Sequence, residues 1–182
     1  MKKVLVLFVV ALLMVGFTNA QTSKIKIGVG PNIALPLGSL GDVTSIGFGV
    51  LAQGEYDLAP QIVGTVTVGY LSFSGKSVNG VDQGSWSVVP ILVGGKYFFT
   101  PNVYGALQIG LNMVSYTAKV PYVTSYAPLT FGYRDETFSS SEFGFNIGVG
   151  YEMKPFDFLV KYGTFGSGTG NISLTALYKF SL

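Results

Sequence analysis

The sequence contains neither cysteine nor histidine among its 182 residues. The absence of cysteine excludes disulfides, thiolate nucleophiles and cysteine-based metal sites. The absence of histidine removes the commonest general base and metal ligand near neutral pH. Most enzyme classes depend on one of these side chains, so we expect a protein without enzymatic activity, metal or cofactor.

Charged residues are also scarce. They make up 11% of the sequence, whereas 48% of the residues are hydrophobic and 25 residues are glycine. About a quarter of the residues of a soluble domain are usually charged, so the composition disfavours a water-exposed globule. The 11 basic and 9 acidic residues form no strongly basic stretch, and we expect no nucleic-acid partner.

The first twenty residues have the layout of a secretory signal peptide. Lys2 and Lys3 precede an apolar run over residues 4–15, and small or polar residues follow as far as Ala20. The run is shorter than the ~20 residues that a membrane-spanning helix needs. We therefore predict a signal peptide over residues 1–20, cleavage after Ala20, and a single mature domain over residues 21–182.

The rest of the sequence alternates between apolar and polar residues with a period of two, which is typical of strands with two different faces. One face carries large aliphatic and aromatic residues, and the other carries mainly glycine, alanine and small polar residues. Eight such segments are predicted, at residues 24–37, 46–57, 62–73, 89–99, 103–113, 142–152, 156–163 and 172–182. Prolines 31, 36 and 90 fall within them and predict bulges or irregular pairing, because proline lacks an amide donor.

Alternation alone does not show which face points outward, since a soluble ligand-carrying barrel has the same pattern reversed. Small residues on the polar face suit a narrow interior, and most segments reach the ~9–11 residues with which a tilted strand crosses a bilayer. Aromatic residues gather near the strand ends, as in the interfacial girdles of membrane barrels. The predicted girdles include Tyr97, Phe99, Tyr104 and Tyr151 at one level and Trp86, Tyr116 and Phe143 at the other.

The connections between the segments alternate in length. Those near residues 58–61, 100–102 and 154–155 are tight, and those at 38–45, 74–85, 117–141 and 164–171 are longer. Outer-membrane barrels have short periplasmic turns and longer outer loops. The pattern therefore predicts an all-β protein, an eight-stranded antiparallel up-and-down transmembrane barrel, with both mature termini in the periplasm.

With these features together, residues 24–182 resemble the small eight-stranded outer-membrane β-barrels of Gram-negative bacteria, the group of OmpX, OmpW and the OmpA membrane domain. The resemblance implies a place in the cell outer membrane and contact with outer-membrane lipid and lipopolysaccharide. It also implies recognition by the outer-membrane assembly machinery of the last segment, which runs from Ile172 to Leu182. A likeness of architecture says little about activity.

Seven charged residues fall on the inward face near the tight turns. A barrel of this size is just wide enough to be filled by its own side chains or to hold one small ligand. Buried charges need partners, so one interpretation is an ion-pair network that plugs the lumen, and the other is a polar constriction or binding floor. The seven are Glu55, Asp57, Lys96, Glu152, Asp157, Lys161 and Lys179.

The third long connection is rich in tyrosine beside charged residues, a composition typical of recognition surfaces. One hypothesis makes this segment a surface for an extracellular partner that the sequence does not identify. The alternative is that the fifth and sixth segments extend above the membrane as a hairpin and these aromatic residues pack on each other. The residues concerned are Tyr122, Tyr126, Phe131, Tyr133 and Arg134.

Three functions are compatible with the sequence. The first is a non-enzymatic outer-membrane barrel with a structural or surface-interaction role and a lumen filled by side chains. The second is passage or binding of a small apolar molecule, as the resemblance to OmpW implies, which would need an open upper lumen lined by apolar residues. Candidates for that lining are Leu71, Phe73, Val88 and Leu92. The third is a soluble periplasmic ligand carrier.

Overall fold

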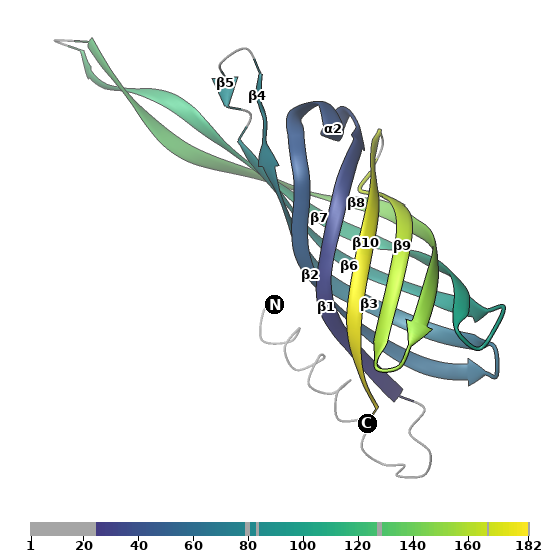
Figure 1. Ribbon diagram of the computed structural model, residues 1–182. Coiled ribbons are helices and arrows are strands. Elements are labelled where there is room, and N and C mark those ends of the chain that lie inside the picture. Colours follow the sequence, from purple (N-terminus) through teal and green to yellow (C-terminus); the bar gives the residue numbers. More distant parts are fainter. Residues whose placement is uncertain (1–24, 79–80, 83, 127–128, 167, 182) are drawn as a thin grey trace, which may run out of the picture.

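The structure, a computed structural model, describes residues 25–78, 81–82, 84–126, 129–166 and 168–181 (Figure 1). The predicted signal peptide lies outside the described residues. Among those described, no helix is long and apolar enough to cross a membrane.

The chain forms a closed barrel of eight antiparallel strands, which confirms the predicted fold (Figure 1). Neighbouring strands follow each other around the barrel in the order β1-β10-β9-β8-β7-β6-β3-β2. A short helix and a two-stranded ribbon, β4 and β5, stand outside this ladder. The elements are β1 (Ile25–Gly38), α2 (Ser39–Val43), β2 (Thr44–Ala59), β3 (Ile62–Gly75), β4 (Ser77–Val78), β5 (Val81–Asp82), β6 (Ser85–Phe98), β7 (Val103–Tyr126), β8 (Leu129–Met153), β9 (Phe156–Thr164) and β10 (Thr169–Ser181).

The two ends of the barrel differ. Tight connections join β2 to β3, β6 to β7 and β8 to β9 at one end, here called the turn end. The other end, the loop end, carries α2, the β4–β5 ribbon, the far part of the β7–β8 hairpin and the β9–β10 connection. Several long connections are therefore regular structure: residues 38–45 are mostly helix, and residues 117–141 are mostly strand.

The apolar face of each strand points outward. If the apolar face pointed into the barrel, residues such as Ile109, Phe145 and Val160 would be buried. Their side chains are instead 45%, 41% and 54% exposed. The opposite face, with its charged and small polar residues, is buried inside the barrel. A soluble carrier would need a polar outer wall, so that alternative does not fit this exterior, and the barrel is of the transmembrane kind.

The edge of the apolar exterior can be read from β7 and β8. Going toward the loop end, the outward residues are apolar as far as Met113 on β7 and Phe143 on β8. Beyond these residues, the same face carries hydroxyl pairs: Ser115 bonds Ser139 and Thr117 bonds Thr137, each at 2.9 Å. This change from apolar to hydroxyl side chains marks where the two strands leave the hydrocarbon layer.

Two of the three predicted prolines, Pro31 and Pro90, interrupt pairing without shifting its register, whereas Pro36 stays paired with Asn171. The β1–β10 ladder has no partners for Gly30 and Pro31, and the β3–β6 ladder has none for Pro90, yet the register is the same on both sides of each gap. Register shifts occur elsewhere, for example between Thr44 and Gly47. At Pro31 and Pro90, the absence of an amide donor therefore interrupts the hydrogen bonding between two strands locally and produces no bulge.

Three residues of the predicted girdles, Trp86, Tyr104 and Tyr116, lie on the inward side of their strands, and two of them are inside the barrel. Tyr104 is fully buried in the lumen, and Trp86 packs against the apolar residues inside the barrel. Both sit at inward positions of their strands, so their place near a strand end was a poor guide to their direction.

Candidate functional site

The turn-end half of the lumen contains a network of buried ion pairs. Five of the seven predicted charges meet there: Glu55, Lys96, Glu152, Asp157 and Lys179. The Lys96 amine lies 2.6 Å from a Glu55 oxygen and also contacts Asp157. The Lys179 amine lies 2.6 Å from the other Glu55 oxygen and 2.7 Å from Glu152. Three carboxylates thus share two amines across the barrel interior.

The network is completed by a residue that the sequence pattern did not single out as polar. The Tyr104 hydroxyl donates to Asp157 at 2.5 Å, and its ring centroid lies 4.5 Å from the Lys96 amine. The ring lies across Gly150, its partner in the β7–β8 ladder. A Cβ at position 150 would stand 2.1 Å from the Tyr104 ring, so glycine is required for this close approach.

The other two predicted charges do not join the network. Asp57 pairs with Lys26 at 2.9 Å near the rim of the turn end. Lys161 is only 7% exposed, yet no carboxylate among the described residues forms an ion pair with it. It stands four residues beyond Asp157 on β9, which is about 13 Å along the strand, too far to reach the network. In this the structure differs from the predicted seven-residue cluster.

The β9–β10 register decides how Lys179 reaches Asp157. A hairpin centred near Gly168 would place Lys179 opposite Asp157, but the partner of Asp157 is Leu177. Lys179 still reaches the network from two residues further along β10, and its amine lies 3.7 Å from Asp157.

A layer of amides and hydroxyls lies next to the ion pairs. Gln53 donates to Glu55 at 2.8 Å and accepts from the Thr67 hydroxyl at 3.1 Å. Gln108 donates to Thr67 at 2.9 Å, and Asn146 donates to Gln108 at 3.3 Å. These buried residues link β2, β3, β7 and β8 through the interior, so the closed part of the lumen extends toward the middle of the barrel.

An apolar cluster occupies much of the loop-end half of the lumen, beside the buried polar residues Thr44, Asn112 and Asn171. Leu71, Phe73, Val88 and Leu92, the four residues proposed as an apolar lining, are all buried inside the barrel. Three of them belong to one apolar cluster, whose buried members are Ala34, Leu40, Leu51, Leu71, Phe73, Val88, Phe165 and Leu177. Phe73 lies across Gly47, where a Cβ would stand 2.4 Å from its ring. The rings of Phe73 and Phe165 meet edge to face at 5.9 Å.

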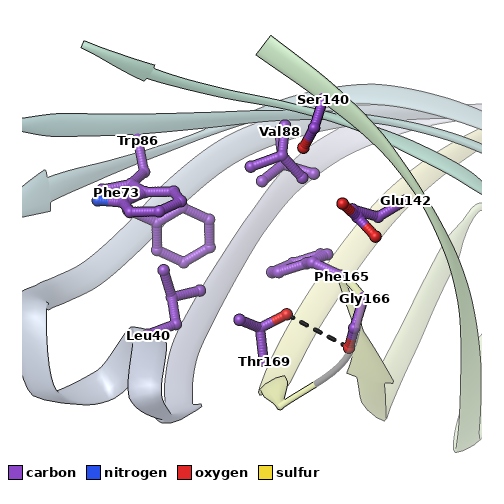
Figure 2. Close-up of a pocket in the computed structure, with 10 residues that line it drawn as sticks. Leu40, Phe73, Trp86, Val88, Ser140, Glu142, Phe165, Gly166 and Thr169 are labelled. Carbon is purple, nitrogen blue, oxygen red and sulfur yellow. Dashed lines mark hydrogen bonds between the residues drawn. The ribbon is translucent and has the colours of Figure 1, made fainter. Parts of the chain in front are cut away.

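Four residues of this cluster, Leu40, Phe73, Val88 and Phe165, line a cavity of about 230 Å³ (Figure 2). Leu40 of α2 forms part of its wall, and the Thr44 hydroxyl fixes the end of that helix by donating to the Leu40 carbonyl at 2.7 Å. Glu142 is the one charged residue among the described residues of the lining. The full lining is Leu40, Phe73, Trp86, Val88, Val114, Ser140, Glu142, Phe165, Gly166 and Thr169.

The predicted recognition segment forms the outer part of the β7–β8 hairpin. The two strands stay paired as far as Tyr126 and Leu129, and in Figure 1 they project well beyond the barrel. Arg134 is exposed and pairs with Glu136. The backbone of Tyr122, Tyr126, Phe131 and Tyr133 is in these strands, while their side chains lie outside what the structure describes.

The base of the hairpin carries an aromatic row on the face that continues the lumen wall. Trp86 on β6, Tyr116 on β7 and Phe138 on β8 are ladder neighbours. The Trp86 and Tyr116 rings lie 4.7 Å apart, and Phe138 is exposed. Phe138 and Glu142 were not predicted as site residues, because Phe138 lies in the long connection and Glu142 at the very start of a predicted strand.

Comparisons with known proteins agree with this geometry. No protein-family model matches the sequence, and no curated protein sequence matches it either. Among solved structures, the chain is similar to Ail, the attachment invasion locus protein of Yersinia pestis, with 12% identity and a TM-score of 0.60. The match covers 88% of this chain and 100% of Ail.

Two further structures are similar. One is Ail of Yersinia pestis in complex with the heparin analogue sucrose octasulfate, with 12% identity and a TM-score of 0.59 over 86% of this chain and 97% of that one. The other is Neisserial surface protein A, with 18% identity and a TM-score of 0.55 over 88% and 98% of the two chains. The fold of this chain is therefore that of the small eight-stranded outer-membrane β-barrels.

Proposed function

We propose that this protein is a non-enzymatic barrel of the outer membrane that presents the β7–β8 hairpin to external surfaces. In this proposal, residues 1–20 are a cleaved signal peptide, residues 21–182 form the mature domain, and the turn end faces the periplasm. The outer face of the barrel contacts lipid and lipopolysaccharide. The assembly machinery recognises the outward apolar residues of β10.

The length of the hairpin is the observation that carries the proposal. β7 has 24 residues and β8 has 25, whereas a tilted strand crosses a bilayer with ~9–11 residues. More than half of each strand therefore serves no spanning role. The two strands place Phe138 and the Arg134–Glu136 pair outside the membrane, and aromatic residues beside arginine are common in protein interfaces.

The lumen supports a surface role over transport. The ion-pair network and the amide layer occupy the turn-end half, and eight strands leave no room for a water-filled channel once side chains fill the interior. This packing supports a barrel that is not a general diffusion pore.

The charge at the loop end bears on the partner. The elements and connections of that end contain three basic residues (Lys76, Lys119 and Arg134) and five acidic ones (Asp42, Asp82, Asp135, Glu136 and Glu142). A polyanion such as a sulfated saccharide is attracted by an excess of basic residues, which this end lacks. We therefore propose a protein or another uncharged or basic surface as the partner of the hairpin.

Deletion of residues 120–136 tests the proposed role. We expect the shortened protein to fold, which heat-modifiable migration on a gel would show, and to lose at least ten-fold in adhesion when it is expressed on a Gram-negative host. Phage adsorption and detergent sensitivity of the same cells would report other surface roles. A folded deletion variant with unchanged values in all three assays would contradict the proposal.

Paired substitutions locate the interacting face. Arg134→Ser with Phe138→Ser changes the aromatic face, and Thr137→Ala with Ser139→Ala changes the hydroxyl face by a matched number of positions. We expect the first pair to reproduce the deletion and the second to leave adhesion unchanged.

A second candidate function is the binding of a small apolar molecule in the loop-end cavity. It is favoured by the apolar walls and by the volume of about 230 Å³. Passage through the barrel axis is not part of this candidate, because the ion pairs lie between the cavity and the turn end. Titration with 2-phenylethanol, followed by the fluorescence of Trp86, would test it, and the absence of any saturable change would contradict it.

A further inference from the structure

We propose that the loop-end cavity binds a small amphipathic cation, an amine attached to an aromatic or aliphatic body, and that Glu142 is its counter-ion. This inference rests on the second candidate function, because it specifies the chemical class of the ligand for the same cavity.

The volume and the lining of the cavity determine the size and the apolar character of the uncharged part of the ligand. A volume of about 230 Å³, filled at the packing density of protein interiors, holds roughly ten non-hydrogen atoms. Three aromatic residues, Phe73, Trp86 and Phe165, form much of the wall, together with Leu40, Val88 and Val114. A single aromatic ring or a short alkyl chain therefore suits the space.

The charge of the ligand follows from Glu142. This residue extends from β8 toward the cavity, above Phe165 and Gly166 (Figure 2). A Cβ at position 166 would stand 3.0 Å from its carboxylate oxygen, and Gly166 has a φ of +123°, so the β9–β10 turn makes room for the carboxylate. No described residue forms a hydrogen bond or an ion pair with the Glu142 side chain. A partly buried carboxylate without a partner is stabilised by a cation from solution.

Among the loop-end residues whose side chains the structure describes, no cation competes for Glu142. The two basic residues of the loop end whose side chains are described have other contacts. Lys76 donates to the Gly41 carbonyl at 2.5 Å, and Arg134 pairs with Glu136. The faces of the aromatic rings attract a cation as well. The excess of acidic over basic residues at the loop end adds a long-range preference of the same sign.

The chain contains its own reporter for the test. Trp86 is the only tryptophan of the sequence and lines the cavity, so its fluorescence responds to occupancy. The full protein, folded in lipid nanodiscs at pH 7, would be titrated with 2-phenylethylamine, 2-phenylethanol and 3-phenylpropanoate. We expect the amine to bind about ten-fold more tightly than the alcohol, and the carboxylate to bind most weakly.

Two variants test whether the charge of Glu142, and not the shape of the cavity, determines the affinity for the amine. Glu142→Gln should lower the affinity for the amine about ten-fold and leave that for the alcohol unchanged. Asp135→Asn, which removes an exposed carboxylate of the hairpin outside the cavity lining, should change neither affinity and controls for the general attraction of cations.

The outcomes distinguish the two proposals. If the alcohol binds as tightly as the amine, or if Glu142→Gln leaves the amine affinity unchanged, the inference is overturned while binding in the cavity stands. If none of the three probes changes Trp86 fluorescence saturably, the second candidate function fails, and the inference fails with it. Equal effects of Asp135→Asn and Glu142→Gln would also overturn the role of Glu142.

Discussion

The two halves of the lumen are filled in different ways. At the turn end, three carboxylates share two amines at short distances, and amide side chains extend the hydrogen bonding toward the middle. At the loop end, aliphatic and aromatic residues pack around a space that they do not fill. The same barrel thus combines a closed polar turn end with a mainly apolar cavity at the loop end that has room for a ligand.

The difference shows how a narrow barrel can be closed and still hold a binding site. Buried ion pairs depend on partners on several strands, so the turn-end half tolerates little movement of any one strand. Apolar packing is not directional, and α2 closes part of the loop end with a single leucine. We therefore expect substitutions in the two halves to have different costs and different consequences for binding.

The largest expected effect is that of Lys96→Met. This change leaves Glu55 and Asp157 without one of their two amines, and breaking a buried pair in this way costs about 3–5 kcal/mol of unfolding free energy. Equilibrium unfolding in urea, with the protein in lipid vesicles, would measure it. Lys161→Met is the control, because Lys161 has no carboxylate partner among the described residues, and we expect its stability to change by less than about 1 kcal/mol or to rise. Equal losses for both variants would show that the pairs contribute nothing specific.

A smaller loss is expected from Phe73→Ala in the apolar half. Removing a buried phenylalanine side chain costs about 3 kcal/mol, the low end of the usual range, because the space beside it is already partly empty. The same unfolding assay would measure it, and Phe73→Leu should lose about 1 kcal/mol. A loss equal to the one measured for Lys96→Met would contradict this difference between the two halves.

The smallest of the three effects is that of Tyr104→Phe, which removes one hydrogen bond to Asp157 and keeps the ring over Gly150. A hydrogen bond to a charged group contributes about 1.5–3 kcal/mol, and we expect the lower value because Lys96 and Lys179 remain near Asp157. Tyr97→Phe is the matched control, since its hydroxyl bonds Gln61 at 3.2 Å on the exposed surface. No difference in unfolding free energy between these two variants would contradict a role for Tyr104 in the network.

Much of the fold could be predicted from the sequence, because a period of two shows directly which residues share a face. The eight strands and their orientation are confirmed, and the lumen charges follow from the same parity. Tyr104 and Trp86 were misjudged because their aromatic character was given more weight than their parity. For residues 117–141 the sequence left two interpretations open, a recognition loop or a hairpin that extends the fifth and sixth segments, because polar strands outside a membrane have no apolar face to indicate them; the backbone is that of the hairpin.

The candidate site was less predictable than the fold. Glu142 lies at the edge of an expected strand, and its place beside Phe165 depends on how β8 and the β9–β10 turn meet across the barrel. Nothing in the local sequence of either segment contains that information. The separation of Lys161 from the ion pairs likewise depends on distances within the barrel, which a list of inward charges does not give.

The strict alternation of the two faces has a consequence for how the barrel forms. If one strand slipped by a single residue, all its side chains would exchange faces. On β9 such a slip would move Asp157 and Lys161 into the acyl chains and turn Phe158 and Val160 inward. A basic side chain at the bilayer midplane costs ~2–4 kcal/mol, and an acidic one costs less. The surrounding lipid therefore selects the correct alignment of neighbouring strands, in addition to the hydrogen bonds that join them.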